Sequence, residues 1–304
     1  MKKPNFAASV KAKLLNYSRA KKLEHNQVLA QYAIERILYR LTQTRHKDSF
    51  LLKGAMLFIV WEGALHRPTT DLDLLGFGET TVGNLEKVFK EVAKVEFSED
   101  GLIFDPNSVK GVEIRAQEEY AGVRITMRAL LGTSIIPVQI DIGVGDAVNP
   151  PPHEIIFPSL LGFPTATIQA CQIETTISEK LHAIVKLGLA NSRMKDYFDL
   201  FYISRTFSFS GDILTSTVRA TFDQRKDINV VESPVGLSVE FARDSTKAAA
   251  WKAFNTKMQK SSETENFEFV LQQVIAFIFP VFRAALFDKK APGTWTPPGP
   301  WKNQ

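Results

Sequence analysis

The sequence predicts an α+β protein, with helices at the start, a group of strands in the middle and a mainly helical C-terminal part. Apolar residues recur at helical spacing over residues 7–41, at every second position over residues 101–144, and again at helical spacing beyond residue 173. A hydrophobic share of 44% and a charged share of 23% are ordinary for a globular chain that buries a core.

The first hundred residues are mostly helical in pattern. The segments expected to form helices are Ala7–Arg19, Asn26–Leu41, Phe50–Trp61 and Leu85–Val95. We expect the third to be buried, because it is strongly apolar, and to begin at the glycine turn Lys53-Gly54-Ala55. Between the third and fourth helices, acidic and apolar residues alternate over Asp71–Leu75, which predicts a short strand.

Period-two alternation then predicts three adjacent strands, around Val112–Ile114, Val123–Met127 and Ile136–Ile142. The prolines at positions 150–152 punctuate the following connection and mark the predicted domain boundary. We therefore predict three parts: a core with its N-terminal helices over residues 1–150, a mainly helical domain over 151–290 that completes the active site, and a tail rich in proline and glycine over 291–304.

The C-terminal part begins with helical spacing over Ile173–Ile203, interrupted at Asn191-Ser192. The next segment gives mixed helical signals, and Phe267–Phe287 is expected to be a final apolar helix despite Pro280. The tail is too rich in proline and glycine for a regular element. It is either disordered or docks through Trp295 and Trp301.

Composition sets the broad class. The single cysteine, Cys171, excludes an internal disulfide framework and fits a cytoplasmic protein in a reducing compartment. No run of about 18 apolar residues is apparent, so we expect no membrane-spanning helix and no membrane partner. The formal charge of +4 is compatible with an anionic partner but does not require one.

The acidic pair Asp71 and Asp73 is the sharpest local feature. Residues two apart on a strand point to the same side, so both carboxylates should project together. Two like charges side by side are costly unless a cation lies between them, and Mg²⁺ is commonly held by one or two carboxylates plus substrate phosphates. The alternative is a strand end that carries two exposed aspartates.

Two further features fit this reading. The amides of Lys53, Gly54 and Ala55 at a helix start would form an anion site for a triphosphate. Asp141 is an isolated charge within the apolar alternation of its strand. It is either a third metal ligand and general base or a charge that faces solvent.

Four motifs in order resemble the nucleotidyltransferase toxins of the AbiEii/MenT group, over about residues 10–203. They are Leu52-Lys53-Gly54-Ala55, Arg67-Pro68-Thr69-Thr70-Asp71-Leu72-Asp73, Ile177-Ser178-Glu179-Lys180-Leu181-His182-Ala183 and Arg193-Met194-Lys195-Asp196-Tyr197-Phe198-Asp199-Leu200. The last hundred residues carry no match to this pattern. The resemblance implies a nucleotidyltransferase core, a mixed sheet flanked by helices, followed by a helical C-terminal part.

The resemblance also implies roles. Asp71 and Asp73 would bind metal, the Gly54 turn would hold the triphosphate, and Lys180 and Asp196 would belong to the active site. Ala55 stands where the superfamily commonly has serine, which puts a side-chain contact there in doubt.

The chemistry of Lys180 and Asp196 fits this mapping. Lys180 could reach a phosphate as a point charge, and Asp196 could accept a hydroxyl proton or orient a cation. The alternative is an interhelical salt bridge.

Several neighbouring residues are weaker candidates. Arg67 and Thr70 could orient the triphosphate, although Thr70 could equally end the turn, and Arg193 and Lys195 could contact phosphate. Arg115 and Arg124 face either the cleft or solvent.

The predicted function is metal-dependent transfer of a nucleotide from an NTP to an acceptor, with Mg²⁺ or Mn²⁺ held by Asp71, Asp73 and Asp141. The resemblance implies the toxin of a toxin–antitoxin or phage-defence system, with a cognate antitoxin and the tRNA 3′ end as acceptor. The alternatives are transfer to a protein or small molecule, or a non-catalytic module that binds nucleotide or antitoxin. We predict that Asp71, Asp73, Lys180 and Asp196 converge around one pocket.

Overall fold

The structure is a computed structural model that describes residues 5–114, 122–226, 229–258 and 266–302. The chain divides into two compact units. The first holds Met1–Asp146 and Pro152–Cys171, and the second holds Ala147–Pro151 and Gln172–Gln304. The boundary predicted at residue 150 falls where the chain first leaves the sheet. The chain then returns to the first unit, because strands beyond residue 150 pair with the sheet.

The first unit begins with α1 (Phe6–Lys21) and α2 (His25–Thr42), so both predicted N-terminal helices are confirmed. Asn5 caps α1 by accepting a hydrogen bond from the amide of Ala8, and Lys22 ends it in the left-handed conformation. Helix α2 is buried along most of its length. Its apolar side chains join the core beneath the sheet.

Helix α2 also carries two buried arginines. Nε of Arg36 and Nη1 of Arg40 both donate to Oδ2 of Asp100, at 2.9 and 2.7 Å. All three side chains are almost fully buried. This ion cluster ties α2 to the 3₁₀ turn Ser98–Asp100. Removing any member would leave an unpaired charge in the interior.

The segment Phe50–Trp61 differs from the prediction of one buried helix. Phe50–Lys53 forms strand β1, Gly54–Met56 forms a 3₁₀ turn, and only Leu57–Glu62 forms helix α3. A short apolar run fits a fully buried strand as well as a buried helix. β1 is such a strand, since it has a neighbouring strand on each side in the sheet.

A mixed sheet of eight strands forms the centre of the first unit, in the order β3-β5-β6-β2-β1-β8-β7, with β4 also paired to β5. Besides β1, its strands are β2 (Asp71–Gly76), β3 (Leu102–Phe104), β4 (Lys110–Ile114), β5 (Gly122–Leu131), β6 (Ser134–Val144), β7 (His153–Phe157) and β8 (Ala166–Ala170). The pairs β2–β6 and β1–β8 are parallel, and the other pairs are antiparallel. The predicted mixed sheet flanked by helices is therefore confirmed.

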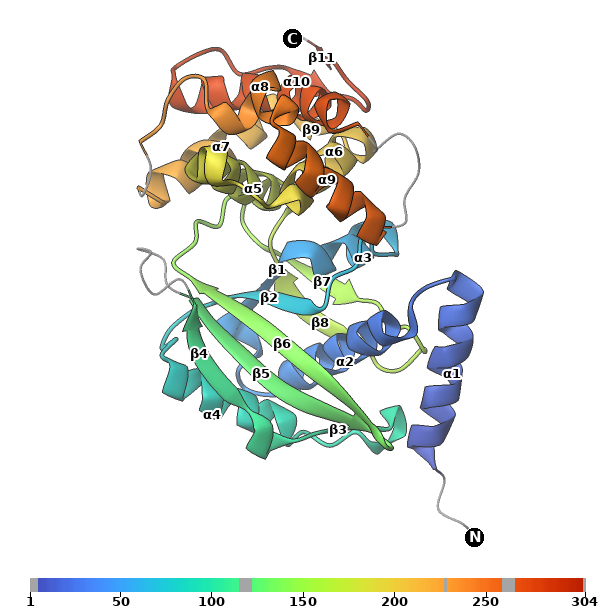
Figure 1. Cartoon of the computed structure of the whole chain (residues 1–304). Coiled ribbons are helices and arrows are strands. Elements are labelled where there is room, and N and C mark those ends of the chain that lie inside the picture. Colours follow the sequence, from blue (N-terminus) through green and yellow to red (C-terminus); the bar gives the residue numbers. More distant parts are fainter. Residues whose placement is uncertain (1–4, 115–121, 227–228, 259–265, 303–304) are drawn as a thin grey trace. The chain divides into compact units, whose positions relative to one another are not determined.

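Helices α2 and α4 (Val82–Ala93) pack on one face of this sheet (Figure 1). The sheet residues directed toward them are apolar and buried, including Leu72 and Leu74 of β2 and Ile140 and Ile142 of β6. Because side chains alternate along a strand, Asp71, Asp73 and Asp141 must point to the opposite face. The helical layer thus decides which face of the sheet carries the acidic residues.

The second unit is mainly helical, as predicted. Its helices are α5 (Ile173–Leu187), α6 (Met194–Thr206), α7 (Gly211–Gln224), α8 (Val239–Arg243), α9 (Ser245–Met258) and α10 (Phe267–Leu286). The predicted break around residues 191–192 is confirmed, since α5 ends at Leu187 and α6 begins at Met194. Helix α10 packs against α6 and α7 and supplies the centre of this unit's core.

Helix α10 corrects the expectation that no segment is long and apolar enough to cross a membrane. Among the described residues it meets both conditions, with a mean hydropathy of 1.8. Its side chains Val274, Phe277, Ile278 and Val281 are fully buried within the unit. A helix that is buried on most sides in a protein core is as apolar as a membrane-spanning helix. The two kinds of helix therefore meet the same conditions of length and hydropathy.

The tail docks instead of being disordered. Strand β10 (Thr294–Trp295) pairs with β9 (Phe209–Ser210) and with β11 (Trp301–Lys302), so two short strands occur where none was expected. The indole of Trp295 is buried and its Nε1 donates to the carbonyl of Ser204 at 2.7 Å. Nε1 of Trp301 donates to the carbonyl of Phe277 at 2.8 Å. The two tryptophans therefore fasten the tail to α6 and α10.

Candidate active site

Two adjacent parallel strands position three carboxylates on the face of the sheet away from α2. Strand β2 presents Asp71 and Asp73, and strand β6 presents Asp141. Asp73 and Asp141 are partners in the β2–β6 register, whereas Asp71 is opposite Gln139. The register therefore brings residues far apart in the sequence to one point.

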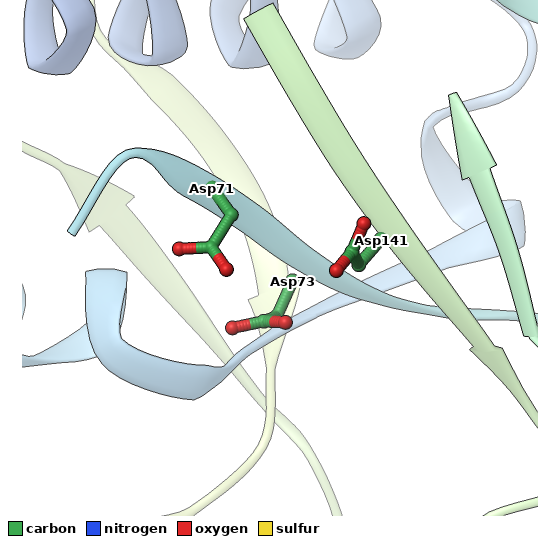
Figure 2. A group of neighbouring side chains, drawn as sticks. All are labelled: Asp71, Asp73 and Asp141. Atoms are coloured by element: carbon green, nitrogen blue, oxygen red, sulfur yellow. The ribbon is translucent and has the colours of Figure 1, made fainter. Parts of the chain in front are cut away.

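The carboxylates of Asp71, Asp73 and Asp141 form a compact acidic cluster (Figure 2). Each offers an oxygen, and these oxygens lie within 4.8 Å of one another. All three side chains are half-buried, so the cluster is neither solvated freely nor sealed in the core. Of the two readings of Asp141, the structure places it with the acidic pair. An isolated surface charge does not describe its position.

Arg124 on β5 contacts this cluster directly. Its Nε donates to Oδ1 and its Nη2 to Oδ2 of Asp141, each at 2.8 Å. The hydrogen bonds to Asp141 raise the pKa of Arg124, and the charges of Asp71 and Asp73 add to the rise. Arg124 is thus directed toward the cluster, which the sequence left open. Arg115 lies outside the described residues.

Thr69 contacts the first aspartate of the pair. Its Oγ1 donates to Oδ1 of Asp71 at 2.6 Å, and its side chain is buried. Thr70, which the sequence suggested for this region, is exposed. Arg67 is buried and its Nη1 donates to the carbonyl of Pro68 at 3.3 Å. The sequence pattern did not distinguish the two threonines, because both stand directly before the acidic pair.

The glycine turn after β1 lies against the second aspartate. Gly54 has φ of +74°, and a β-carbon built there would lie 2.1 Å from Oδ2 of Asp73. Only glycine fits both the conformation and the space. Ala55 is buried beside it. The turn and the acidic pair are therefore in direct contact, and each limits the position of the other.

Lys53 precedes this turn and is the partner of Asp73 in the β1–β2 register. Its Nζ lies 2.5 Å from Oδ2 of Asp146, just beyond the end of β6. Asp146 is a fourth carboxylate of this region that the sequence did not single out, because its role depends on where β6 ends. The contact fixes the ammonium group of Lys53 beside the sheet.

A second ionic cluster lies in the second unit, between α5 and α6. Nζ of Lys180 is 3.2 Å from Oδ1 of Asp196 and 2.6 Å from Oδ2 of Asp199. Nε of Arg193 donates to Oδ2 of Asp196 at 2.6 Å. Both carboxylates are fully buried, and Lys180 is 12% exposed. Lys195, which lies between Arg193 and Asp196 in the sequence, is exposed.

Asp196 stays ionised in this cluster. Burial raises its pKa, but the positive charges of Lys180 and Arg193 and the hydrogen bond from Arg193 outweigh burial and leave the pKa below its ordinary value. A carboxylate with a lowered pKa is a weak proton acceptor. Its contacts suit the orientation of two cations better than the acceptance of a proton.

The chain matches a family model described as the nucleotidyl transferase AbiEii toxin of a type IV toxin–antitoxin system, over residues 36–273. That match spans more than half of the chain. The chain belongs to the AbiEii nucleotidyltransferase family. The match extends past residue 203, so the family pattern continues into the part where the sequence motifs gave no match. As an AbiEii-family protein, the chain is a nucleotidyltransferase of a type IV toxin–antitoxin family.

A solved structure shows the same fold. The crystal structure of a candidate nucleotidyltransferase from H. pylori aligns with a TM-score of 0.51 and 14% sequence identity, covering 88% of this chain and 100% of that chain. JHP933 from Helicobacter pylori aligns with a TM-score of 0.46 and 14% identity, covering 90% of this chain and 94% of its own. No curated protein sequence matches the chain.

The acidic cluster has the chemistry that a divalent metal needs in an AbiEii-family enzyme. Its three ligand groups are all carboxylates, hard oxygen donors of the kind that Mg²⁺ prefers. Their oxygens are close enough to share one ion or a pair of ions. The residues therefore fit the metal-binding role, whereas the roles of Arg67, Thr70, Arg193 and Lys195 toward nucleotide stay predictions.

Proposed function

We propose that this AbiEii-family enzyme transfers the nucleotide of an NTP to the 3′ end of tRNA, with Mg²⁺ held by Asp71, Asp73 and Asp141. The observation that carries the proposal is the meeting of these carboxylates within 4.8 Å on two registered strands. Mn²⁺ takes similar oxygen ligands and should replace Mg²⁺. The ligand set contains neither sulfur nor imidazole, which argues against a zinc site.

In the proposed reaction, the oxygen of the terminal hydroxyl bonds to the α-phosphorus, the bond from that phosphorus to its bridging oxygen breaks, and pyrophosphate leaves. The bound metal would neutralise phosphate charge and acidify the attacking hydroxyl. Asp71 and Asp73 would hold it, with Thr69 orienting Asp71 through the 2.6 Å hydrogen bond. Asp141 would complete the ligand set and receive the hydroxyl's proton.

The Gly54 turn would hold the triphosphate. The turn lies against Asp73, so a triphosphate on its amides would lie next to the metal ligands. Lys53 and Ala55 flank Gly54 on either side, and Lys53 would add a positive charge. The absence of a hydroxyl at Ala55 leaves backbone amides as the contact.

We assign Lys180 and Arg193 to phosphate binding and Asp196 to their orientation. Lys180 bridges two buried carboxylates, which fixes its ammonium group at the edge of α5. A cation held in this way keeps its charge and its place without reorganisation when an anion arrives. The convergence of these residues with Asp71 and Asp73 in one pocket remains part of the proposal.

The acceptor assignment rests on the family resemblance and on charge. Helix α1 buries Val10 and Leu14 and leaves Lys13, Arg19 and Lys21 exposed. Exposed cations of this kind suit an RNA backbone. Within the type IV toxin–antitoxin family, we further propose a cognate antitoxin, a cytoplasmic location and a role in phage defence.

The test is to incubate the protein with each of the four α-³²P-labelled NTPs, Mg²⁺ and either total RNA or total protein. We expect one NTP to label tRNA, and we expect periodate oxidation of the tRNA 3′ end to abolish labelling. Asp73→Asn is the inactive control, and Lys252→Ala, at an exposed position of α9, controls for general loss of surface charge.

Label in protein, or in RNA whose 3′ end is blocked, would overturn the tRNA assignment. In cells, growth arrest should require both Asp71 and Lys180. Wild-type toxicity of both Asp71→Ala and Lys180→Ala would refute the proposed site.

A further inference from the structure

Four charged residues lie side by side in one row across the sheet. Lys53 is opposite Asp73 in the β1–β2 register, Asp73 is opposite Asp141 in β2–β6, and Asp141 is opposite Arg124 in β6–β5. The row therefore reads cation, carboxylate, carboxylate, cation. Arg124 is the cation on the β5 side.

We propose that Arg124 exchanges partners: it holds Asp141 while the metal is absent and moves to a phosphate of the NTP when metal and nucleotide bind. The inference rests on the proposed metal site, and goes beyond it by assigning a role to a residue outside the family motifs that the sequence displays.

The contacts of Arg124 give it the first of these partners. Its Nε and Nη2 meet both oxygens of Asp141 in a two-pronged pair at 2.8 Å. Gln139, two residues before Asp141 on the same strand, places its amide oxygen 3.2 Å from both Nε and Nη2 when that oxygen faces the guanidinium. The guanidinium is thus fitted to this position, and its two-pronged geometry is the strongest form of such a pair.

The same pair conflicts with a metal ion. A divalent cation bound by Asp71, Asp73 and Asp141 would share the Asp141 carboxylate with a guanidinium that already contacts both oxygens. Two cations on one carboxylate repel each other, and the repulsion is stronger in a half-buried site than in water. Metal binding should therefore weaken the Arg124–Asp141 pair.

Arg124 has room to leave and a second partner to meet. Its side chain is 38% exposed, whereas that of Asp141 is 16% exposed, so the guanidinium lies at the open side of the pair. An NTP bound at the metal brings phosphate oxygens whose spacing matches the same two-pronged donor geometry. Arg124 would then replace its ion pair with the Asp141 carboxylate by an ion pair with the negatively charged phosphates of the nucleotide.

Arg128 provides a matched control on the same strand and the same face. Its Nη2 donates to Oδ2 of Asp105 at 2.7 Å, so it too is an arginine of β5 that is paired with an aspartate. Neither partner belongs to the acidic cluster. Any effect of Arg124→Gln that Arg128→Gln does not reproduce must come from the cluster.

The experiment measures two affinities in the full-length protein. Binding of Mn²⁺ without nucleotide is followed by room-temperature EPR, which detects the free ion. Binding of the α,β-methylene analogues of the four NTPs is measured at saturating Mn²⁺, since these analogues cannot lose pyrophosphate. For Arg124→Gln we expect Mn²⁺ to bind about tenfold more tightly and the best analogue to bind about tenfold more weakly than in wild type. Arg128→Gln should change neither.

Opposite signs of the two changes are the signature of exchange. A residue that only orients Asp141 would, when removed, weaken Mn²⁺ binding by about 10- to 100-fold. Weaker or unchanged Mn²⁺ binding in Arg124→Gln would therefore overturn the proposal, as would unchanged analogue binding. If Arg124→Gln does not fold, Arg124→Lys keeps the charge but loses the two-pronged geometry. It should then weaken analogue binding, and wild-type analogue affinity in Arg124→Lys would also overturn the proposal.

Failure of the proposed metal site gives a different result. If Asp73→Asn leaves Mn²⁺ binding at the wild-type level, the cluster does not hold the metal, whatever Arg124 does. If Asp73→Asn abolishes binding but Arg124→Gln does not tighten it, the metal site stands and the exchange alone is refuted.

Discussion

The carboxylate of Asp73 lies directly against the α-carbon of Gly54, so close that a β-carbon at position 54 would meet Oδ2 at 2.1 Å. In the proposed function, Asp73 is a metal ligand and Gly54 belongs to the turn that receives phosphate. Here each sets the position of the other. A change at Gly54 should therefore be read out at the metal.

Gly54→Ala should reduce nucleotidyl transfer by about 100-fold or more, because displacement of a ligand by about 1 Å is enough for such a loss. It should also weaken Mn²⁺ binding measured by EPR. Gly78→Ala is the control, since Gly78 has φ of +80° and nothing within 4 Å of the added β-carbon. Both variants carry the same backbone strain, so equal losses of activity would contradict the prediction.

Magnesium should stabilise the wild-type protein against heat, because a ligand that binds only the native state raises its free energy of unfolding. Differential scanning fluorimetry should show Tm rising with Mg²⁺ concentration, and EDTA should reverse the rise. In Asp73→Asn the rise should disappear, because one of the three carboxylates within 4.8 Å is lost. A Tm that rises equally in both proteins would place the responsible ion elsewhere.

The local features of the site could be predicted from the sequence, and the relations between strands could not. Asp71 and Asp73 are marked by their alternation with Leu72 and Leu74, which depends only on neighbours along the chain. The N-terminal helices and α10 were predicted for the same reason. Each of these patterns depends only on residues that are close together in the sequence.

By contrast, the roles of Arg124 and Asp146 depend on register and on where a strand ends. Arg124 meets Asp141 because β5 and β6 pair antiparallel in one of several possible registers. β1 was mistaken for a helix because a short apolar run carries no decisive period. The buried Arg36–Asp100 pair gave no signal, since arginine and aspartate side chains usually lie at the surface.

Lys180→Ala should cost both activity and stability. Removal of the ammonium group leaves Asp196 and Asp199, both fully buried, with less positive charge between them. Breaking a buried pair on one side costs about 3 to 5 kcal/mol in the free energy of unfolding. Urea titration should show this loss, whereas Lys195→Ala, at an exposed position, should unfold like wild type. Unchanged unfolding of Lys180→Ala would show that water or other cations compensate.

The stability of the second unit should fall in acid. Burial raises the pKa of Asp196, but the positive charges of Lys180 and Arg193 outweigh burial and hold the pKa below its ordinary value in the folded protein. A depressed folded pKa contributes stability that is present above the unfolded pKa and is lost as pH falls through the folded pKa. Urea titrations from about pH 5 downward should therefore show a steeper decline in wild type than in Asp196→Asn, which has no proton to bind. Equal slopes would contradict a lowered pKa at this residue.

The predicted convergence of the two ionic clusters can be tested as a distance. A nitroxide attached to Lys195→Cys would lie next to Asp196, and labelling should be selective because Cys171 is buried. Mn²⁺ at the acidic cluster should then broaden and weaken the nitroxide EPR signal when an α,β-methylene NTP is also bound, since a paramagnetic ion relaxes a nearby spin. Asp73→Asn in the same labelled protein is the control, because it removes the metal and leaves the nitroxide in place. A nitroxide signal that is the same in both proteins would mean that Lys180 and Asp196 do not act in the pocket of Asp71 and Asp73, and the second cluster would then be a structural salt bridge between α5 and α6.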